Sequence, residues 1–205
     1  MIRQLSLLGV EAADPAPEDL EGLLAGPGQV VRMGGTARVS IVVDAAWRVH
    51  VLVDELAARG LGATWVSTVD DRYGVRSAYS TGLAAMATAW LRGAVKMPPP
   101  GFALDGRRLR LWIAAAGMPA RPEADGPAGR QPPGFLLRLG ASDEPAWAPV
   151  GAALAAIGLT GALLSPRGGG PAYRIEGRRR LDRLAELVGD PPILAPPGVW
   201  PGERP

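Results

Sequence analysis

In this 205-residue sequence, arginine is the residue type whose spacing suggests a binding function. Five arginines stand at polar positions of segments that alternate between apolar and polar residues, which is the pattern of half-buried strands. A guanidinium binds phosphate through two parallel hydrogen bonds and can also read guanine O6 and N7. We therefore expect one sheet face that binds nucleic acid, formed by Arg32, Arg38, Ser40, Arg76, Arg138 and Arg174.

A second basic group opens the last expected helix with Arg178, Arg179 and Arg180. The positive end of the helix dipole is an unfavourable place for three cations unless an anion meets them. We therefore add Arg178 and Arg179 to the expected DNA-binding residues. Asp182 and Glu186 could offset this charge instead.

The structural alternative for these arginines is a solvated or ion-paired surface. Asp44 and Glu176 stand close enough in the sequence to pair with Arg38 or Arg174. The net charge of +2 is also small for a surface that neutralises many phosphates.

Other chemistries are excluded or weak by composition. The chain has no cysteine, which excludes disulfides, thiolate catalysis and Cys-ligated zinc. Because His50 is its one histidine, metal sites made of several histidine ligands are excluded. Among 22 basic residues only Lys96 is lysine, and asparagine is absent, a bias typical of a high-GC bacterial genome. We expect no metal and no cofactor.

The hydrophobic periodicity predicts helices and strands in two similar sets. The first set has helices at 17–26, 45–59 and 82–95, the last capped by Thr81, and strands at 29–34, 36–44, 63–69 and 73–80. The second set has helices at 107–116, 147–158 and 178–188, and strands at 135–140, 162–165 and 172–176.

The two sets match at a constant offset of 98 residues. Leu56–Leu61 aligns with Leu154–Leu159, and Arg76 aligns with Arg174. This offset predicts a fused tandem repeat with a pseudo-twofold axis. We expect the fold to belong to the α+β class. Proline- and glycine-rich stretches then divide the chain into an N-terminal segment (1–16), a first repeat (17–96), a linker (97–101), a second repeat (102–189) and a tail (190–205).

Smaller features complete this division. We expect a long loop within 118–134 and a glycine turn at 168–170. Ile193, Leu194 and Trp200 could attach the proline-rich tail to the body of the protein.

This αββαββα unit, used twice, resembles the LAGLIDADG homing-endonuclease fold. Leu20–Gly28 is similar to the family motif, and Leu109–Gly117 is a poorer match. The chain is also similar to the LAGLIDADG-like domain of the sporulation regulator WhiA. The resemblance implies that the two motif helices pack side by side, and a close crossing needs small residues. The small residues available for this contact are Gly22, Ala25, Gly26, Ala114 and Ala115.

The motif departs from the family at its eighth position. The resemblance implies an acid there in each repeat, and the two acids would bind a divalent metal that drives phosphodiester hydrolysis. This chain has Pro27 and Ala116 instead, and neither side chain offers the oxygen ligand that a hard cation requires. We therefore expect no nuclease activity.

Together these patterns predict a catalytically inactive, LAGLIDADG-like protein that binds double-stranded DNA as a regulator or chromosome-associated factor. We expect a monomer with an internal two-fold. We expect a cytoplasmic location, since the sequence has no 18-residue apolar run that could enter a membrane. If the protein binds DNA, we expect it to be associated with the nucleoid. The alternative is a scaffold of the same fold for a protein partner. A continuous positive saddle would favour DNA binding, whereas an apolar or mixed saddle would favour the scaffold.

Overall fold

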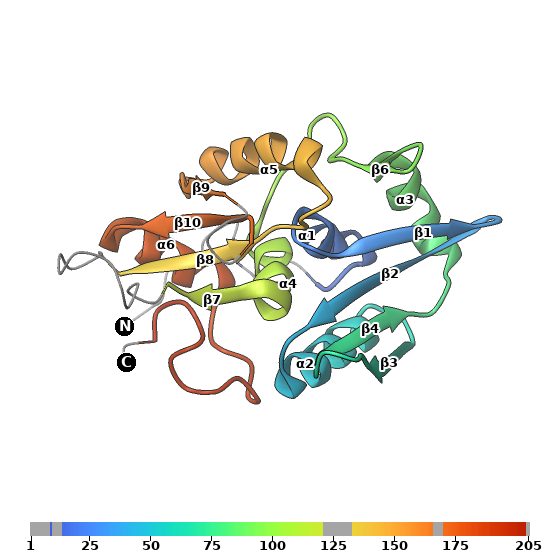
Figure 1. Cartoon of the computed structure of the whole chain (residues 1–205), viewed down its shortest axis with the longest axis horizontal. Helices are drawn as coiled ribbons and strands as arrows, with labels where there is room; N and C mark the ends of the chain where they lie inside the picture. The colour runs from blue at the N-terminus through green and yellow to red at the C-terminus, as the bar shows by residue number, and fades with distance from the viewer. Residues whose placement is uncertain (1–8, 10–13, 121–132, 166–169, 204–205) are drawn as a thin grey trace.

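The computed structural model describes residues 9, 14–120, 133–165 and 170–203. Most of the N-terminal segment and of the loop expected within 118–134 lies outside these residues, as does most of the glycine turn at 168–170. The described part is a mixed α+β fold, as the sequence predicts (Figure 1).

The first half of the chain contains a four-stranded antiparallel sheet with the strand order β1-β2-β4-β3. Its elements are η2 (Pro17–Leu20), α1 (Glu21–Ala25), β1 (Gln29–Met33), β2 (Thr36–Val43), α2 (Ala46–Ala57), β3 (Ala63–Ser67), β4 (Tyr73–Ser77), η3 (Thr81–Leu83) and α3 (Ala84–Trp90). A short hairpin of β5 (Leu91–Arg92) and β6 (Val95–Lys96) follows α3.

The second half repeats the element order and has the sheet order β7-β8-β10-β9. Its elements are α4 (Gly106–Ala116), β7 (Gly117–Pro119), β8 (Gly134–Arg138), α5 (Glu144–Ala156), β9 (Ala162–Leu164), β10 (Ala172–Glu176) and α6 (Arg178–Val188).

The offset of 98 residues also appears in the hydrogen-bond register. Arg76 of β4 faces Thr64 of β3, and Arg174 of β10 faces Ala162 of β9, so both members of each pair differ by 98. The two hairpins therefore have the same register, although one carries threonine where the other carries alanine.

Helices α2 and α5 end in the same way. The amide of Leu61 donates to the carbonyl of Leu56, and the amide of Leu159 donates to the carbonyl of Leu154. Gly60 and Gly158 adopt left-handed backbone angles, with φ of +69° and +84°, between these partners. This is the Schellman termination, which glycine permits because it has no Cβ.

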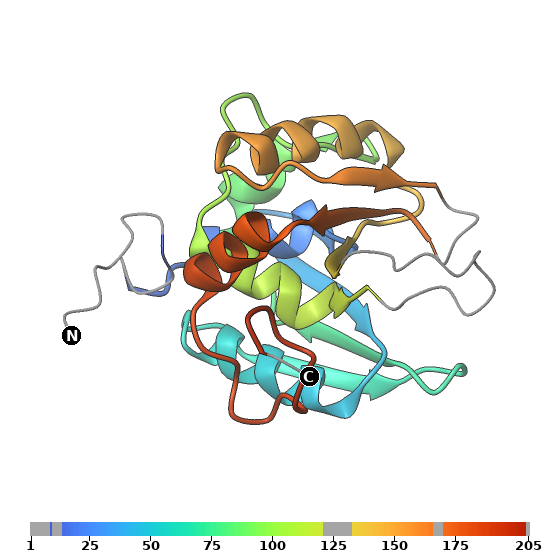
Figure 2. The ribbon, with the colours of Figure 1, turned by 90° about the vertical axis from the view of Figure 1, so that its left-hand side faces the viewer.

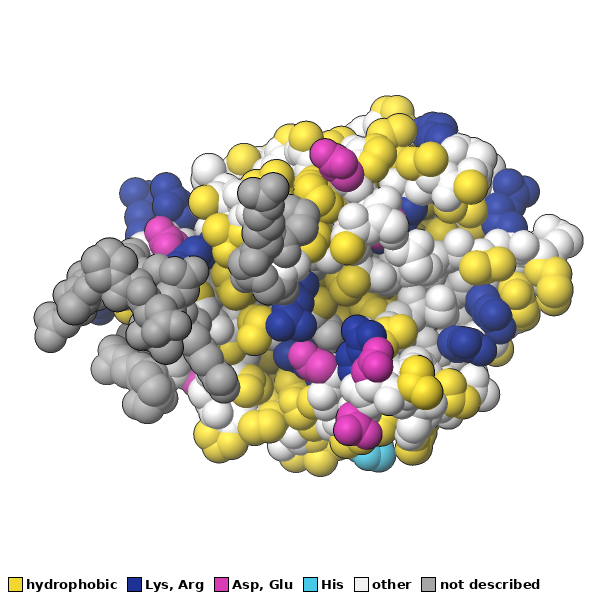
Figure 3. Space-filling view, in the orientation of Figure 1, with side chains coloured by type: hydrophobic (Ala, Val, Ile, Leu, Met, Phe, Trp, Pro, Cys, Tyr) yellow, Lys and Arg dark blue, Asp and Glu magenta, His cyan; other side chains and the backbone are white. Residues whose placement is uncertain are grey.

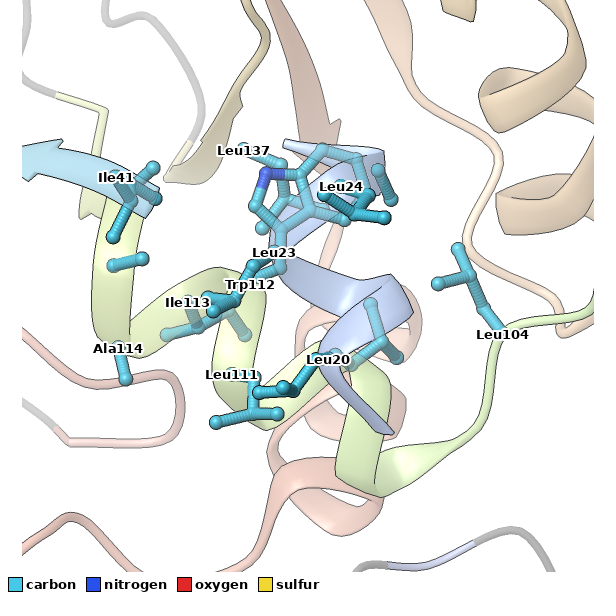
Figure 4. Packing of buried hydrophobic residues seen from close by; sticks show 14 of the residues in the cluster. Leu20, Leu23, Leu24, Ile41, Leu104, Leu111, Trp112, Ile113, Ala114 and Leu137 are labelled. Atoms are coloured by element: carbon cyan, nitrogen blue, oxygen red, sulfur yellow. The ribbon is translucent and has the colours of Figure 1, made fainter. Parts of the chain in front are cut away.

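Helices α1 and α4 pack side by side at the centre, as expected (Figure 4). The closest approach is at Gly22, where an added Cβ would lie 1.9 Å from the carbonyl oxygen of Arg108. At Gly26 an added Cβ would lie 2.5 Å from Cδ1 of Trp112. Ala25, Ala114 and Ala115 are buried in the same core.

Helices α2 and α6 cover one side of the sheets, and α5 lies along an edge (Figure 1). Figure 1 looks onto the sheets with α2 and α6 behind them, and Figure 2 shows the layers from the side. The surfaces of the two sheets that face away from these helices are called the outer faces below. The proline-rich tail packs on the helical side through Trp200, whose ring centroid lies 5.2 Å from the guanidinium carbon of Arg110 of α4.

Several sequence-based boundaries were wrong. Ser80, not Thr81, accepts the capping hydrogen bond from the Gly82 amide. The helix expected to reach residue 95 ends at Trp90, because the chain turns into the β5–β6 hairpin. Strand β7 was missed because it directly continues α4.

Of the three side chains expected to attach the tail, only Trp200 is buried. Trp200 is 2% exposed, and its indole N–H donates to the carbonyl of Gly189. Ile193 and Leu194 are exposed, which corrects the expectation that they also anchor the tail.

Candidate nucleic-acid interface

A polar row crosses the outer face of the first sheet. Ser40 of β2 lies opposite Gln29 of β1 on one side and Arg76 of β4 on the other, and Arg76 lies opposite Thr64 of β3. Side chains of directly opposed residues project from the same face of a sheet. The four polar side chains therefore share one face, and each can form hydrogen bonds.

Arg38 adds a second cation beside Arg76. It stands two residues before Ser40 on β2, so it lies diagonally across from Arg76 on the same face. Its guanidinium carbon lies 4.8 Å from the ring centroid of Tyr79. Within the described residues neither Arg38 nor Arg76 forms an ion pair with a carboxylate, so this face carries two uncompensated positive charges.

Arg32 lies on the opposite face, which corrects the sequence interpretation. It is opposed by Ala37, which is fully buried on the helical side, whereas Arg38 is opposed by Val31. Val31 and Met33 lie on the outer face instead and are 44% and 58% exposed. The error arose because two consecutive valines begin this strand, and it is Val30 that enters the core.

Arg138 and Arg174 lie on the outer face of the second sheet, as expected. Arg174 of β10 is opposed by Leu136, and Arg138 of β8 is two residues further along that strand. Both are ion-paired: Arg138 lies 3.4 Å from Asp44, and Arg174 contacts Glu176. The pairing of Asp44 with Arg38 that the sequence allowed is not formed; Asp44 pairs with Arg48 and Arg138.

Arg178 and Arg179 belong to a different part of the surface. Both are exposed at the start of α6, and they line a cavity of about 780 Å³ with Ile157 and Gly158 at the end of α5. Arg178 lies 3.8 Å from Asp182. The structure therefore does not bring these arginines together with the sheet arginines around one cavity.

The two motif helices end at a second, central cavity of about 180 Å³. It is lined by Pro27 after α1 and by Ala115, Ala116 and Gly117 at the end of α4. Val42 and Met118, which stand on the outer faces of the two sheets, extend the lining outward. The remaining lining residues include three arginines and one acid: Arg48, Arg72, Arg138 and Asp44.

Arg48 caps the end of α4 from the other half of the chain. Its guanidinium donates to the carbonyl oxygens of Ile113, Ala114 and Gly117 at 3.0, 2.8 and 2.6 Å, and its Nε donates to Asp44 at 3.0 Å. The side chain is 7% exposed. A cation is stabilised at a helix C-terminus because the last carbonyl groups carry partial negative charge.

Lys96 caps the end of α1 in a similar manner. Its Nζ donates to the carbonyl oxygens of Gly26 and Gly28 at 2.8 and 2.6 Å and pairs with Asp143 of the second half at 2.8 Å. Burial lowers the pKa of Lys96, and the hydrogen bond and charge of Asp143 oppose that shift. Burial likewise lowers the pKa of Arg48 against the pull of Asp44.

This donor set does not fit a divalent cation. Pro27 and Ala116 supply no ligand oxygen, and Asp44 already pairs with Arg48 and Arg138. In the part of the chain that the structure describes, no three histidine, aspartate or glutamate side chains come together to hold a metal. The acids of the motif helices, Glu21 and Asp105, instead pair with Arg108 at the opposite end of the helix pair.

The side of the molecule formed by the sheets exposes apolar, basic and acidic side chains together. Figure 3 shows hydrophobic side chains over much of it, with basic side chains in separate groups and acidic ones beside the central groups. On the first sheet the outer face exposes Val31, Met33, Val42 and Val66 by 44–58%. The surface therefore has no continuous positive band in this view (Figure 3). By the criterion given with the sequence, this mixed surface favours the scaffold alternative, and DNA binding depends on the local arginine pair described above.

Comparison with solved structures identifies the architecture. A homing endonuclease, I-WcaI, described as bound to its DNA recognition sequence, superposes with a TM-score of 0.59 at 10% sequence identity. The match covers 86% of this chain and 82% of that one. The fold is that of a LAGLIDADG homing endonuclease. The resemblance found in the sequence is therefore confirmed for the fold.

No protein-family model matches this chain, and no curated protein matches its sequence. Within the described residues no helix has both the length and the apolar character needed to span a bilayer.

Sequence reasoning missed the buried cations. Arg48 stands in an amphipathic helix segment and looks like a surface residue until its contacts with α4 are known. Lys96 did offer a signal, because it is the one lysine in a chain that otherwise uses arginine.

Proposed function

We propose that this protein binds double-stranded DNA on the outer faces of its two sheets and does not cleave it. The observation that carries the proposal is the pair Arg38 and Arg76. The two arginines lie diagonally on neighbouring strands, within reach of each other for long side chains, and no carboxylate of the described chain pairs with either one. A phosphate or a guanine edge would compensate them, since guanidinium binds both.

The polar row supports the same proposal. Ser40, Arg76 and Thr64 cross three strands side by side, and these side chain types form hydrogen bonds at base edges. Gln29 extends the row onto β1, where its amide nitrogen donates to Asp143 at 3.0 Å. The exposed valines beside them are compatible with contact to thymine methyl groups. The solved endonuclease with this fold is described as DNA-bound, which agrees with the proposal.

The absence of cleavage is part of the proposal. At the end of the motif helices the chain has Pro27 and Ala116, and the nearest cavity carries more guanidinium than carboxylate groups. A divalent cation would be repelled from such a site, whereas DNA would still meet positive charge. A role as a regulator or chromosome-associated protein follows from binding without cleavage.

A titration with a labelled random-sequence duplex at two salt concentrations tests the proposal. We expect binding at low salt that weakens as salt rises, with a slope of log affinity against log salt set by the number of phosphates contacted. No affinity for any duplex at low salt would contradict it.

A protein scaffold is the second candidate, and the exposed Val31, Met33, Val42 and Val66 favour it. Exposed apolar groups of this kind mark protein interfaces. The two candidates differ in salt dependence, because contact through apolar side chains does not release the counterions of DNA. A protein that captures a partner through this face with little salt dependence, and ignores DNA, would be the scaffold.

A further inference from the structure

We propose that the open edge of strand β3 (Ala63–Ser67) is an interface for a second copy of this chain, joined by antiparallel β3–β3 pairing. The inference goes beyond the proposed function, because it concerns the edge of the first sheet and not the arginines of its outer face. It departs from the monomer expected from the sequence.

Strand β3 forms one end of the first sheet. The strand order β1-β2-β4-β3 gives it a neighbour, β4, on one side, and Figure 1 shows it at the margin of the sheet. Four of its residues, from Thr64 to Ser67, are exposed. Within the described residues no strand pairs with this edge.

The hydrogen bonds that flank β3 determine which of its residues bond to β4. At one end the amide of Ala78 donates to the carbonyl oxygen of Gly62 at 2.6 Å. At the other end the amide of Thr68 donates to the carbonyl oxygen of Arg72 at 2.7 Å, and both pairs continue the β3–β4 register. Hydrogen-bonded and non-hydrogen-bonded pairs alternate along an antiparallel ladder, so the even-numbered residues of β3 bond to β4.

The odd-numbered residues, Ala63, Trp65 and Ser67, therefore direct their N–H and C=O groups at the open edge. An identical strand that pairs antiparallel about Trp65 places Ala63 opposite Ser67 and Trp65 opposite itself. Every outward N–H then meets an outward C=O of the other copy. This match makes the edge complementary to itself, as a two-fold interface requires.

The side chains of β3 are compatible with this pairing. None of them is charged, so two copies bring no like charges together. On the helical side Trp65, opposed by the buried Val75 of β4, would meet the same residue of the second copy. On the outer face Thr64 would meet Val66, and aromatic and β-branched cross-strand pairs stabilise a sheet. Trp65 and Val66 are 49% and 51% exposed, so pairing removes apolar surface from water.

The other edges of the two described four-stranded sheets carry features that hinder strand pairing. Strand β1 contains a charged residue, Arg32, strand β7 ends in Pro119, and strand β9 has three residues. Charge, proline and short length protect an exposed edge from other chains. Strand β3 has none of these features, and its register with β4 contains no bulge. Its open edge is therefore the one suited to a further strand.

Strand β9 supplies an internal comparison, because it occupies the equivalent edge of the second sheet. Leu163 of β9 follows Trp65 at the repeat offset of 98 residues, and it is 47% exposed. Tyr173 opposes Leu163 as Val75 opposes Trp65. Leu163 is therefore the matched position for a control substitution.

Analytical ultracentrifugation over about a hundredfold range of protein concentration tests the dimer, since dimerisation follows mass action. We expect the wild type to pass from monomer to dimer as the concentration rises. Trp65→Lys should abolish the dimer over this range, because it places two ammonium groups opposite each other on the two-fold axis. The control Leu163→Lys should dimerise like the wild type.

Ser67→Pro tests the backbone pairing separately. Proline is tolerated at an edge position whose N–H faces solvent, so the β3–β4 pairing is kept. Each dimer loses the two N–H donors of residue 67, and we expect dimerisation to weaken by at least about tenfold. Circular dichroism of the three variants checks that the fold is kept.

A wild type that stays monomeric at every concentration would overturn the proposal. A dimer that persists in both β3 variants would also overturn it, because another surface would then join the copies. An equal loss in Leu163→Lys would do the same, since the effect of lysine would then be general. None of these measurements contains DNA, so a wild type that dimerises but ignores duplex would retain this interface and contradict only the proposed function.

Discussion

Arg48, in the first half of the chain, donates a 2.6 Å hydrogen bond to the carbonyl oxygen of Gly117 in the second half. The contact joins the start of α2 to the end of α4 and crosses the interface between the two halves. Together with Lys96 at the end of α1, it places a buried cation at the terminus of each motif helix. In both cases the partner carboxylate, Asp44 or Asp143, stands between a central strand and the next helix.

Replacing Arg48 tests the importance of this cap. Arg48→Met should lower the free energy of unfolding by about 3–5 kcal/mol, because three carbonyl groups and part of Asp44 lose a buried partner. Urea denaturation measures the effect. Arg72→Met removes an exposed ion pair and should cost within about 1 kcal/mol. A similar small cost for both variants would contradict the cap.

The close crossing of α1 and α4 predicts a strong effect at Gly22. Gly22→Ala adds a Cβ that would lie 1.9 Å from a backbone oxygen of Arg108, which cannot rotate away. We expect a loss of roughly 3 kcal/mol or more, or failure to fold, since overpacking against a rigid neighbour shifts the helices apart. Gly35→Ala is the control, because nothing lies within 4 Å of an added Cβ there. Equal thermal stability of the two variants would show that the helices do not cross this closely.

The tail offers a test within one segment. Trp200→Ala should destabilise the protein by about 3–5 kcal/mol, because a buried indole and its hydrogen bond to Gly189 are lost. Ile193→Ala should change stability by no more than about 0.5 kcal/mol, since that side chain is fully exposed. Thermal denaturation of both variants measures this contrast, and a reversed order of stability would contradict the packing of the tail.

Incubation with supercoiled plasmid and Mg²⁺ or Mn²⁺ tests the proposed lack of cleavage. We expect no nicking above background, because Pro27 and Ala116 provide no metal ligand. Nicking that grows with protein and disappears with chelator would reveal a metal site elsewhere. Introducing acids by Pro27→Asp and Ala116→Asp need not restore cleavage, since Arg48 and Arg138 lie at the same cavity.

Most of the order of elements could be predicted from the sequence because hydrophobic periodicity and glycine positions determine it locally. The short strands β5, β6 and β7 were not predicted. Leu56–Leu61 and Leu154–Leu159 revealed the offset of 98 residues, and the structure gives both segments the same helix end. The outward direction of four strand arginines also followed from alternation. Arg32 was placed wrongly because two consecutive valines allow either alternation, and only pairing with Ala37 decides between them.

The central cavity could not be predicted from the sequence. Its charge depends on Arg48 reaching residues 65 to 69 positions away and on Asp44 meeting Arg138 at a separation of 94. Such contacts depend on how the two halves pack together, which periodicity within one segment does not encode. The same holds for Lys96, whose burial became evident only with Gly26 and Gly28 around it.

The most direct test of the proposed DNA function compares two arginines of the same sheet that lie on opposite faces. Duplex affinity is measured by fluorescence anisotropy for wild type, Arg76→Ala and Arg32→Ala at several salt concentrations. Arg76→Ala should weaken binding by roughly 1–3 kcal/mol if it reads a base edge, or lower the salt slope by about one unit if it holds a phosphate. Arg32→Ala should leave both quantities unchanged, because Arg32 shares its face with the buried Ala37. Equal losses in the two variants, or no duplex binding by the wild type, would contradict the assignment of the outer sheet faces to DNA.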